Sequence, residues 1–448
     1  MPGYEVHTVA HKMFLSQLPE WVKIYAVLAE DAFKLDDMFA KIGRTSQTCV
    51  DSNAAMLKIA AKLNGTINGT NFLTMIRAIR ELQPAALITD AGFKAEGYLQ
   101  RVCQEQGTAF ILMHCPGRPP FSKRIGTKDG PSIMRYLWAL FWNSSFRMTK
   151  TLVQNVKDMK TLVDPAVAHL KKDKRKLDDS VVLLPGAECL YNYLALPHEI
   201  STGPFLHLPK PQMGSDRIQV SASNFRSPEM SQDLREWLLA EQGTPIVYVA
   251  LGTIVRPPEA TLRRIVQALL GSPWRVLWAM RAECQEDLPE EARLSSLQWR
   301  VERWVPQYDV LSFEGVRCFM SHCGQNSTME ALSLGVPMVC MPFYCDQYEW
   351  AHAVTLVAKA GLEVDKFKSK PAQIRDAVRH VIEEPRFAEA ARNAAKAMRV
   401  EMEEKTGQMR LNQSGAMPGV TVAANVIIDM IEGRRPAHGF EIRRLSRL

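Results

Sequence analysis

The segment 304–347 combines residue types that could hold a diphosphate, a ribose and a sugar. Within it, a short apolar run at 316–320 predicts a buried strand. This strand leads through Gly324 into a helix that we expect to start near Asn326 and to end at Gly335. The N-terminus of a helix presents unpaired backbone N–H groups and the positive end of the helix dipole. The segment therefore predicts a binding site for a diphosphate that needs no metal.

Polar side chains surround this predicted helix N-terminus. We expect Asn326 and Ser327 to add hydrogen-bond donors for the phosphates, and His322 to add a donor and positive potential. Gly324 would let the backbone approach a phosphate closely. Glu330, in the first turn or so of the helix, could accept hydrogen bonds from two ribose hydroxyls. One short helix could thus serve both the phosphates and the ribose.

Both ends of the segment add candidate contacts. Trp304, followed by Val305 and the amide of Gln307, could stack its indole on a pyrimidine base; the alternative is that Trp304 is a core anchor. Asp346 and Gln347 follow an apolar strand and a turn, so both should project from the carboxyl end of that strand, where ligands of open α/β sheets bind. A carboxylate beside an amide suits the vicinal hydroxyls of a hexose.

In this order and spacing, the motifs W-V-P-Q, H-C-G-Q-N-S, E, G-V-P and D-Q resemble the donor-binding signature of family 1 UDP-glycosyltransferases. Gln325 departs from the Trp of many members, and Phe313 departs from the usual His. The resemblance implies an α/β protein of GT-B fold, in which two Rossmann-like domains with parallel sheets face each other across a cleft. It also implies that Thr253, at the end of a strand reading LGT, bonds the distal phosphate; an ordinary turn is the alternative.

The pattern of strands and helices divides the chain in two. Residues 74–116 alternate helix and strand in the manner of a parallel, doubly wound sheet, with Asp90 at the carboxyl end of a strand. We predict an acceptor-binding domain at 1–205, a linker at 206–228 and a donor-binding domain at 229–418. The remainder, 419–448, is predicted to form a helix that crosses back to the first domain, followed by a basic tail.

Catalysis poses a problem at the N-terminus. The resemblance implies a catalytic His after the first strand of the first domain, oriented by an acid that matches Asp90. Residues 2–14 align with the second strand of the family, so the first strand and its His are missing from the sequence. His114, after the strand FILM, is the best substitute base. We expect the natural polypeptide to extend upstream of Met1.

The sequence predicts an inverting transferase that moves a hexose from a UDP-sugar to a hydroxyl of a small, hydrophobic acceptor. Glucose is favoured because Gln347 ends the signature, and the absence of an Asp-x-Asp triplet predicts that no metal or other cofactor is needed. Two alternatives stay open. The chain could bind a UDP-sugar without catalysing transfer because it lacks the His, or it could epimerise or hydrolyse the nucleotide sugar.

Composition limits the partners. Nine scattered cysteines, with no C-x-x-C pair, favour a reducing compartment, and neither a signal peptide nor an apolar run of ~18 residues is present, so we predict a cytoplasmic protein. The net charge of +7 comes without aromatic interleaving or a nucleic-acid-binding module, which argues against nucleic acid as a partner. The apolar stretch 132–148 could be a lid over the acceptor, a peripheral membrane contact or ordinary core.

Overall fold

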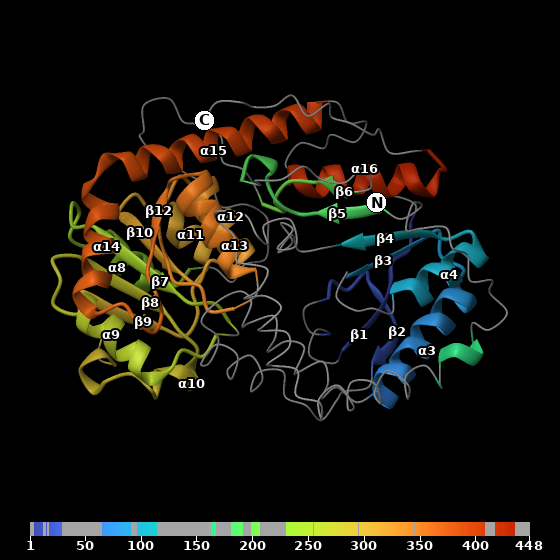
Figure 1. Ribbon diagram of the computed structural model, residues 1–448, viewed down its shortest axis with the longest axis horizontal. Coiled ribbons are helices and arrows are strands. Elements are labelled where there is room, and N and C mark those ends of the chain that lie inside the picture. Colours follow the sequence, from blue (N-terminus) through green and yellow to red (C-terminus); the bar gives the residue numbers. More distant parts are fainter. Residues whose placement is uncertain are drawn as a thin grey trace, which may run out of the picture.

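The computed structural model describes two α/β domains (Figure 1). The described residues are 4–11, 15, 18–28, 65–90, 96–113, 161, 163–166, 181–190, 199–206, 230–407 except 254, 294 and 345, and 417–434. The predicted segment 132–148 and almost all of the predicted linker at 206–228 lie outside these residues.

The second domain is built on one parallel sheet of six strands in the order β12-β11-β10-β7-β8-β9. The strands are β7 (Ile246–Ala250), β8 (Arg275–Ala279), β9 (Trp299–Glu302), β10 (Val316–Ser321), β11 (Met338–Cys340) and β12 (Gly361–Glu363). All five residues of β7 are buried, as expected for a central strand of a parallel sheet that is covered on both faces.

Two hydrophobic cores lie on the two faces of this sheet, and β7 supplies both by alternation. Val247 and Val249 belong to the core under α9 (Glu259–Leu269) and α14 (Pro371–Glu383). Ile246 and Tyr248 belong to the opposite core, with α8, α11, α12 and α15. These last helices are α8 (Gln232–Leu239), α11 (Gln307–Ser312), α12 (Gln325–Ser333) and α15 (Pro385–Gly407); α10 (Ala282–Gln285) and α13 (Gln347–His352) complete the α-helices described in this domain up to residue 407.

The first domain contains two separate parallel sheets where the sequence predicted one. A four-stranded sheet has the order β3-β4-β5-β6, and β1 pairs with β2 in a sheet of two. The strands are β1 (His7–His11), β2 (Lys23–Leu28), β3 (Ala86–Asp90), β4 (Ala109–Met113), β5 (Val181–Leu184) and β6 (Glu199–Ser201), and the helices α3 (Gly65–Leu82) and α4 (Glu96–Gln106) accompany them.

The split falls between β1 and β3. A doubly wound sheet carries its first strand in the middle, paired on both sides. Among the described residues β3 pairs with β4 alone, and Ile88 at its centre is 42% exposed, which is unusual for an apolar residue of a sheet that helices cover. The single sheet that the sequence predicted is therefore not formed by the described strands, because no described strand joins β1 to β3.

The chain's last helices join the two domains. α16 (Pro418–Ile431) packs Ala423, Val426 and Ile427 against Ile111 and Leu183 of the first sheet. α15 starts in the second domain and reaches the 3-10 turn η3 (Glu188–Leu190), which follows β5 (Figure 1). No helix in the described ranges is long and apolar enough to cross a membrane.

A cluster of three charged residues around a buried lysine fixes this junction. We call it the interdomain clasp; it consists of Glu188, Glu401 and Lys405. The Lys405 side chain is 3% exposed and its Nζ donates to Glu401 Oε1 at 2.8 Å, to Glu188 Oε1 at 2.9 Å and to the Ser201 carbonyl at 3.1 Å. Glu401 in turn accepts from the backbone N–H groups of Glu188 and Cys189 at 2.9 and 3.1 Å.

One segment of the first domain packs against the second domain. Ala187 and Leu190, assigned by sequence to the first domain, pack in the core of the second domain. The reason is that η3 follows directly from β5 but docks on α15, whose Glu401 accepts from two of its N–H groups. The segment 187–190 is thus the part of the first domain that the second domain holds.

Replacing Lys405 with Met should lower the free energy of unfolding by about 3 kcal/mol, because Glu401 would stay buried without its cation. Urea unfolding followed by circular dichroism measures this difference. Lys396→Met is the matched control, since Lys396 is an exposed lysine of the same helix. Equal stabilities of the two variants would show that the clasp does not hold the domains together.

Candidate functional site

The predicted donor residues gather at the carboxyl edge of the second sheet. Thr253 follows β7, Trp304 follows β9, and His322 follows β10. After β11, Asp346 is the N-cap residue of α13 and Gln347 is the first residue of that helix. Four parallel strands thus deliver the side chains that the sequence singled out to one edge, where ligands of such sheets bind.

The centre of this edge is the N-terminus of α12. Gly324 is the N-cap residue and has no side chain that could occupy the N–H groups of the first turn. Asn326 is exposed in that turn, whereas Ser327 is buried. The helix therefore offers backbone donors and a positive dipole end, as the sequence predicted for a diphosphate.

His322 is held between two glycines. A Cβ atom added at Gly252 or at Gly324 would lie 2.5 Å from its Nε2 atom, and Gly252 also has a φ of +83°. Burial lowers the pKa of His322 to about 4, although the Ala250 backbone acts in the opposite direction. The imidazole is therefore neutral at pH 7. In this neutral state His322 acts as a hydrogen-bonding group, whereas the sequence predicted that it also supplies positive potential.

The carboxylate of Glu330 is held in place by a hydrogen bond from the Gln307 amide. Gln307 Nε2 donates to Glu330 Oε2 at 2.7 Å and to Ser327 Oγ at 3.0 Å, and the Tyr248 hydroxyl donates to Gln307 Oε1 at 3.2 Å. Burial raises the pKa of Glu330 to about 7, which the bond from Gln307 partly offsets. The amide of Gln307 thus orients the carboxylate, a role that the sequence did not predict.

Trp304 is 51% exposed, which decides between the two interpretations of this residue. A core anchor would be buried, whereas a stacking platform for a base needs an open ring face. Val305 beside it is buried in the core, so only its backbone can meet a ligand. The exposed indole fits the predicted base platform.

Of the side chains of Asp346 and Gln347, which the sequence predicted to contact a hexose, one is partly engaged within the protein. Burial raises the pKa of the Asp346 carboxyl to about 6. Gln347 is 4% exposed, and its Oε1 accepts the N–H groups of Phe343 and Tyr344 at 2.9 and 3.1 Å. Its carbonyl oxygen is therefore engaged within the turn, and the Nε2 group is what remains for a sugar.

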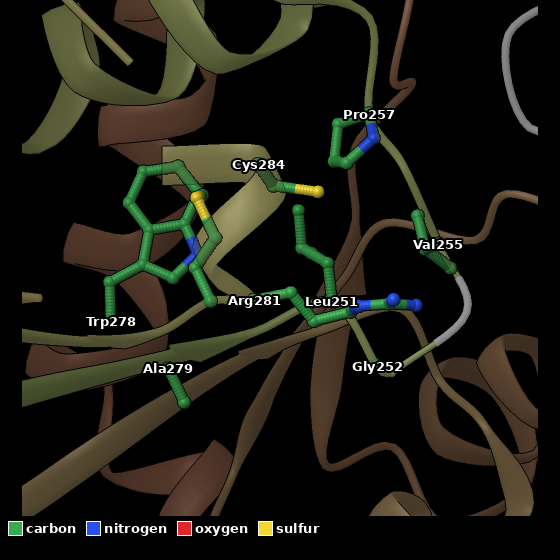
Figure 2. Close-up of a pocket in the computed structure, with 9 residues that line it drawn as sticks. Leu251, Gly252, Val255, Pro257, Trp278, Ala279, Arg281 and Cys284 are labelled. Atoms are coloured by element: carbon green, nitrogen blue, oxygen red, sulfur yellow. The ribbon is translucent and has the colours of Figure 1, made fainter. Parts of the chain in front are cut away.

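A small pocket adjoins Thr253 between the ends of β7 and β8 (Figure 2). Gly252, Val255, Trp278, Arg281 and Cys284 are among the residues that line it. Arg281 Nη1 donates to the Thr253 carbonyl at 2.8 Å and so fixes the loop that carries Gly252. The sequence analysis did not identify Arg281; its position two residues after the strand RVLWA was the available signal.

The structure describes little of the acceptor side. Asp90 is the last residue of β3, and its backbone is in register with Met113 of β4. His114, the substitute base, lies outside the described residues. The structure therefore brings the predicted donor residues to one sheet edge, while the candidate base His114 stays a prediction.

Replacing Gly252 with Ala should abolish measurable binding of a uridine nucleotide at millimolar concentration or weaken it at least about tenfold. The new methyl group would displace the His322 ring, and the positive φ would be strained. Isothermal titration calorimetry with UDP tests this. Gly271→Ala is the control, because Gly271 also has a positive φ, +70°, but has open space around it.

Glu330 also predicts a pH dependence. A ribose hydroxyl donates to the ionised carboxylate, and with a pKa of about 7 this form is lost as the pH falls. UDP affinity should therefore fall up to about tenfold between about pH 8 and about pH 6. In Glu330→Gln only the smaller dependence from protonation of UDP itself should remain. Identical pH profiles for the two proteins would exclude this role.

Known proteins match the second domain. Residues 206–399 match the family described as "UDP-glucoronosyl and UDP-glucosyl transferase". The chain is 39% identical over 167 residues to UDP glycosyltransferase 9 of Catharanthus roseus, covering 36% of this chain and 35% of that one. It is 35% identical over 167 residues to a flavonol 7-O-beta-glucosyltransferase of Arabidopsis thaliana, covering 36% and 37%. The matched part spans little more than a third of the length of each relative.

Solved structures match nearly the whole chain. An anthocyanidin 3-O-glucosyltransferase in complex with UDP has a TM-score of 0.59 at 19% identity, over 95% of this chain and 91% of that one. Os79 from O. sativa in complex with UDP has a TM-score of 0.57 at 19% identity, over 94% and 93%. These likenesses confirm the GT-B fold, and the resemblance of the signature is confirmed by the match of residues 206–399 to the UDP-glucuronosyl and UDP-glucosyl transferase family.

Proposed function

We propose that the protein is an inverting glycosyltransferase that moves glucose from UDP-glucose to a hydroxyl of a small, hydrophobic acceptor. The observation that carries this proposal is the N-terminus of α12, capped by Gly324, with the exposed Trp304 and the carboxyl of Glu330 at the same sheet edge. The matched relative named as a flavonol glucosyltransferase, and the solved anthocyanidin glucosyltransferase with UDP, support the sugar and the acceptor class.

In the proposed complex each part of UDP-glucose has its own partner. The uracil stacks on Trp304, the ribose hydroxyls donate to Glu330, and the diphosphate lies at the N-terminus of α12. The sugar lies toward Asp346 and Gln347, where a carboxyl oxygen and an amide N–H group are available.

Transfer is a single displacement. The acceptor oxygen attacks the anomeric carbon and forms the new C–O bond, while the bond from that carbon to the distal phosphate oxygen breaks and UDP leaves with the electron pair. A base takes the proton of the acceptor hydroxyl. The backbone donors of α12 stabilise the charge that develops on the leaving phosphate. We therefore propose that no divalent metal is required, and that turnover persists in excess chelator.

The acceptor half of the proposal rests on the sequence. Asp90 and His114 are the candidates for proton transfer, and the apolar segment 132–148 is the candidate for the acceptor pocket or a membrane contact. A cytoplasmic location also stays a prediction; it is supported by the free thiols of the described cysteines.

One observation favours a second candidate function. Asp90 ends β3, the edge strand of the four-stranded sheet, and no described strand lies between β3 and β1. The donor site is assembled while the catalytic edge is open in the described part of the chain. A protein of this kind would bind a UDP-sugar without transferring it.

Two measurements on the full chain separate these functions. Calorimetry with UDP and UDP-glucose tests the donor site, with Trp304→Ala as the variant expected to bind about tenfold more weakly, because it loses base stacking of ~1–3 kcal/mol. Release of UDP from UDP-glucose, in the presence of a panel of phenolic and alcoholic acceptors, tests transfer. Binding with transfer supports the first proposal and binding without transfer the second. Absence of binding would contradict both.

His114→Ala tests the candidate base. Turnover should fall at least about 100-fold, the usual contribution of a general base, while UDP affinity stays unchanged. His380→Ala is the control, because His380 lies on α14 and is paired with Glu384 on the surface. Unchanged turnover in His114→Ala would remove this residue from the mechanism.

A further inference from the structure

A buried lysine lies behind the turn that carries Asp346 and Gln347. Lys366, on the loop after β12, is 4% exposed. Its Nζ donates to the Phe343 carbonyl and to the Tyr348 hydroxyl, the latter at 3.3 Å. The rings of Phe343, Tyr348 and Phe367 surround it, with centroids 5.2, 5.8 and 5.0 Å from the ammonium. Burying an ammonium group is costly, so its place needs an explanation beyond core packing.

The backbone of Lys366 is itself anchored. Its carbonyl accepts the Thr261 hydroxyl at 2.8 Å and a bond from Arg264, both on α9. Asp365 Oδ1 accepts hydrogen bonds from the backbone N–H groups of Phe367 and Lys368, at 2.7 and 2.8 Å. The lysine therefore extends from a loop anchored on α9 to the turn that follows β11.

The turn is held through the backbone N–H and the carbonyl of Phe343. The Phe343 carbonyl accepts from Lys366 and, at 3.2 Å, from Tyr348, while the Phe343 N–H donates to Gln347 Oε1 at 2.9 Å. Because Oε1 is engaged, the amide of Gln347 has one orientation, with Nε2 left to donate. If Phe343 moved, Gln347 would lose the partner that sets this orientation.

We propose that Lys366 is a positioning residue for the donor sugar, acting through Phe343 and Gln347. In this arrangement Gln347 donates to one sugar hydroxyl and Asp346 accepts from its neighbour, so the site selects a hexose with two adjacent hydroxyls in that relation. The inference rests on the proposed function and deepens it, because it names a residue of the sugar subsite that is remote from the diphosphate.

A double-mutant cycle read by calorimetry tests this. Lys366→Met should leave the dissociation constant of UDP within about twofold and weaken UDP-glucose about tenfold, as should Gln347→Ala. Since both act through one amide, the double variant should bind UDP-glucose no more than about twofold more weakly than Gln347→Ala alone. Lys368→Met is the matched control, an exposed lysine on the same loop, and should match the wild type.

Other outcomes would overturn the inference. If Lys366→Met weakens UDP and UDP-glucose equally, or if the two effects multiply in the double variant, the lysine is only a structural residue. If Lys366→Met does not fold, Tyr348→Phe provides the test, because it keeps the lysine and removes one hydrogen bond to the Phe343 carbonyl. This variant should bind UDP-glucose about threefold more weakly and UDP as the wild type does. Unchanged UDP-glucose binding would refute the proposal. A wild-type protein that binds neither ligand would refute the proposed function itself. If the wild type binds UDP but the effects of Lys366→Met and Gln347→Ala on UDP-glucose binding multiply, only the role of Lys366 is refuted.

Discussion

The interdomain clasp is the interaction on which the arrangement of the molecule depends. An ammonium that is 3% exposed is costly to bury, and Lys405 is tolerated because two carboxylates and a carbonyl surround it. The clasp fixes η3 on α15, and close by the Gln325 amide, on the first residue of α12, donates to the Pro185 carbonyl at the end of β5. Helix α12 is thus tied to the first domain's sheet at the same junction. The position of α12 and the relation of the two domains are consequently one structural constraint.

The electrostatics of the donor edge follow from burial rather than from fixed positive charges. His322 is neutral, so the attraction for a diphosphate comes from backbone N–H groups and the helix dipole. Burial also raises the pKa values of Glu330 and Asp346, which limits the negative charge at the edge before the ligand arrives. Both carboxyls become better acceptors once hydroxyls donate to them.

Much of this fold was predictable because its signals are local. The alternation of β7, the strand preceding Gly324 and the motif order all lie within short windows, so they predicted the second sheet and the location of its donor residues. The state of those residues was not predictable. The protonation of His322 depends on burial between two glycines, one of them 70 positions away. Lys366 lies in a loop rich in lysine, and nothing local distinguishes it from the exposed Lys368; its partner Phe343 is 23 positions away.

The clasp also determines which edge of the first sheet is attached to the second domain. It holds the first sheet beside β5 and β6, whereas Asp90 ends β3 at the opposite edge of the order β3-β4-β5-β6. Neighbouring strands are about 4.8 Å apart, so Asp90 lies roughly 10 Å from β5, across two strand spacings. The clasp therefore fixes the edge of the first sheet that carries β5 and β6, whereas β3, which ends at Asp90, lies two strand spacings from β5.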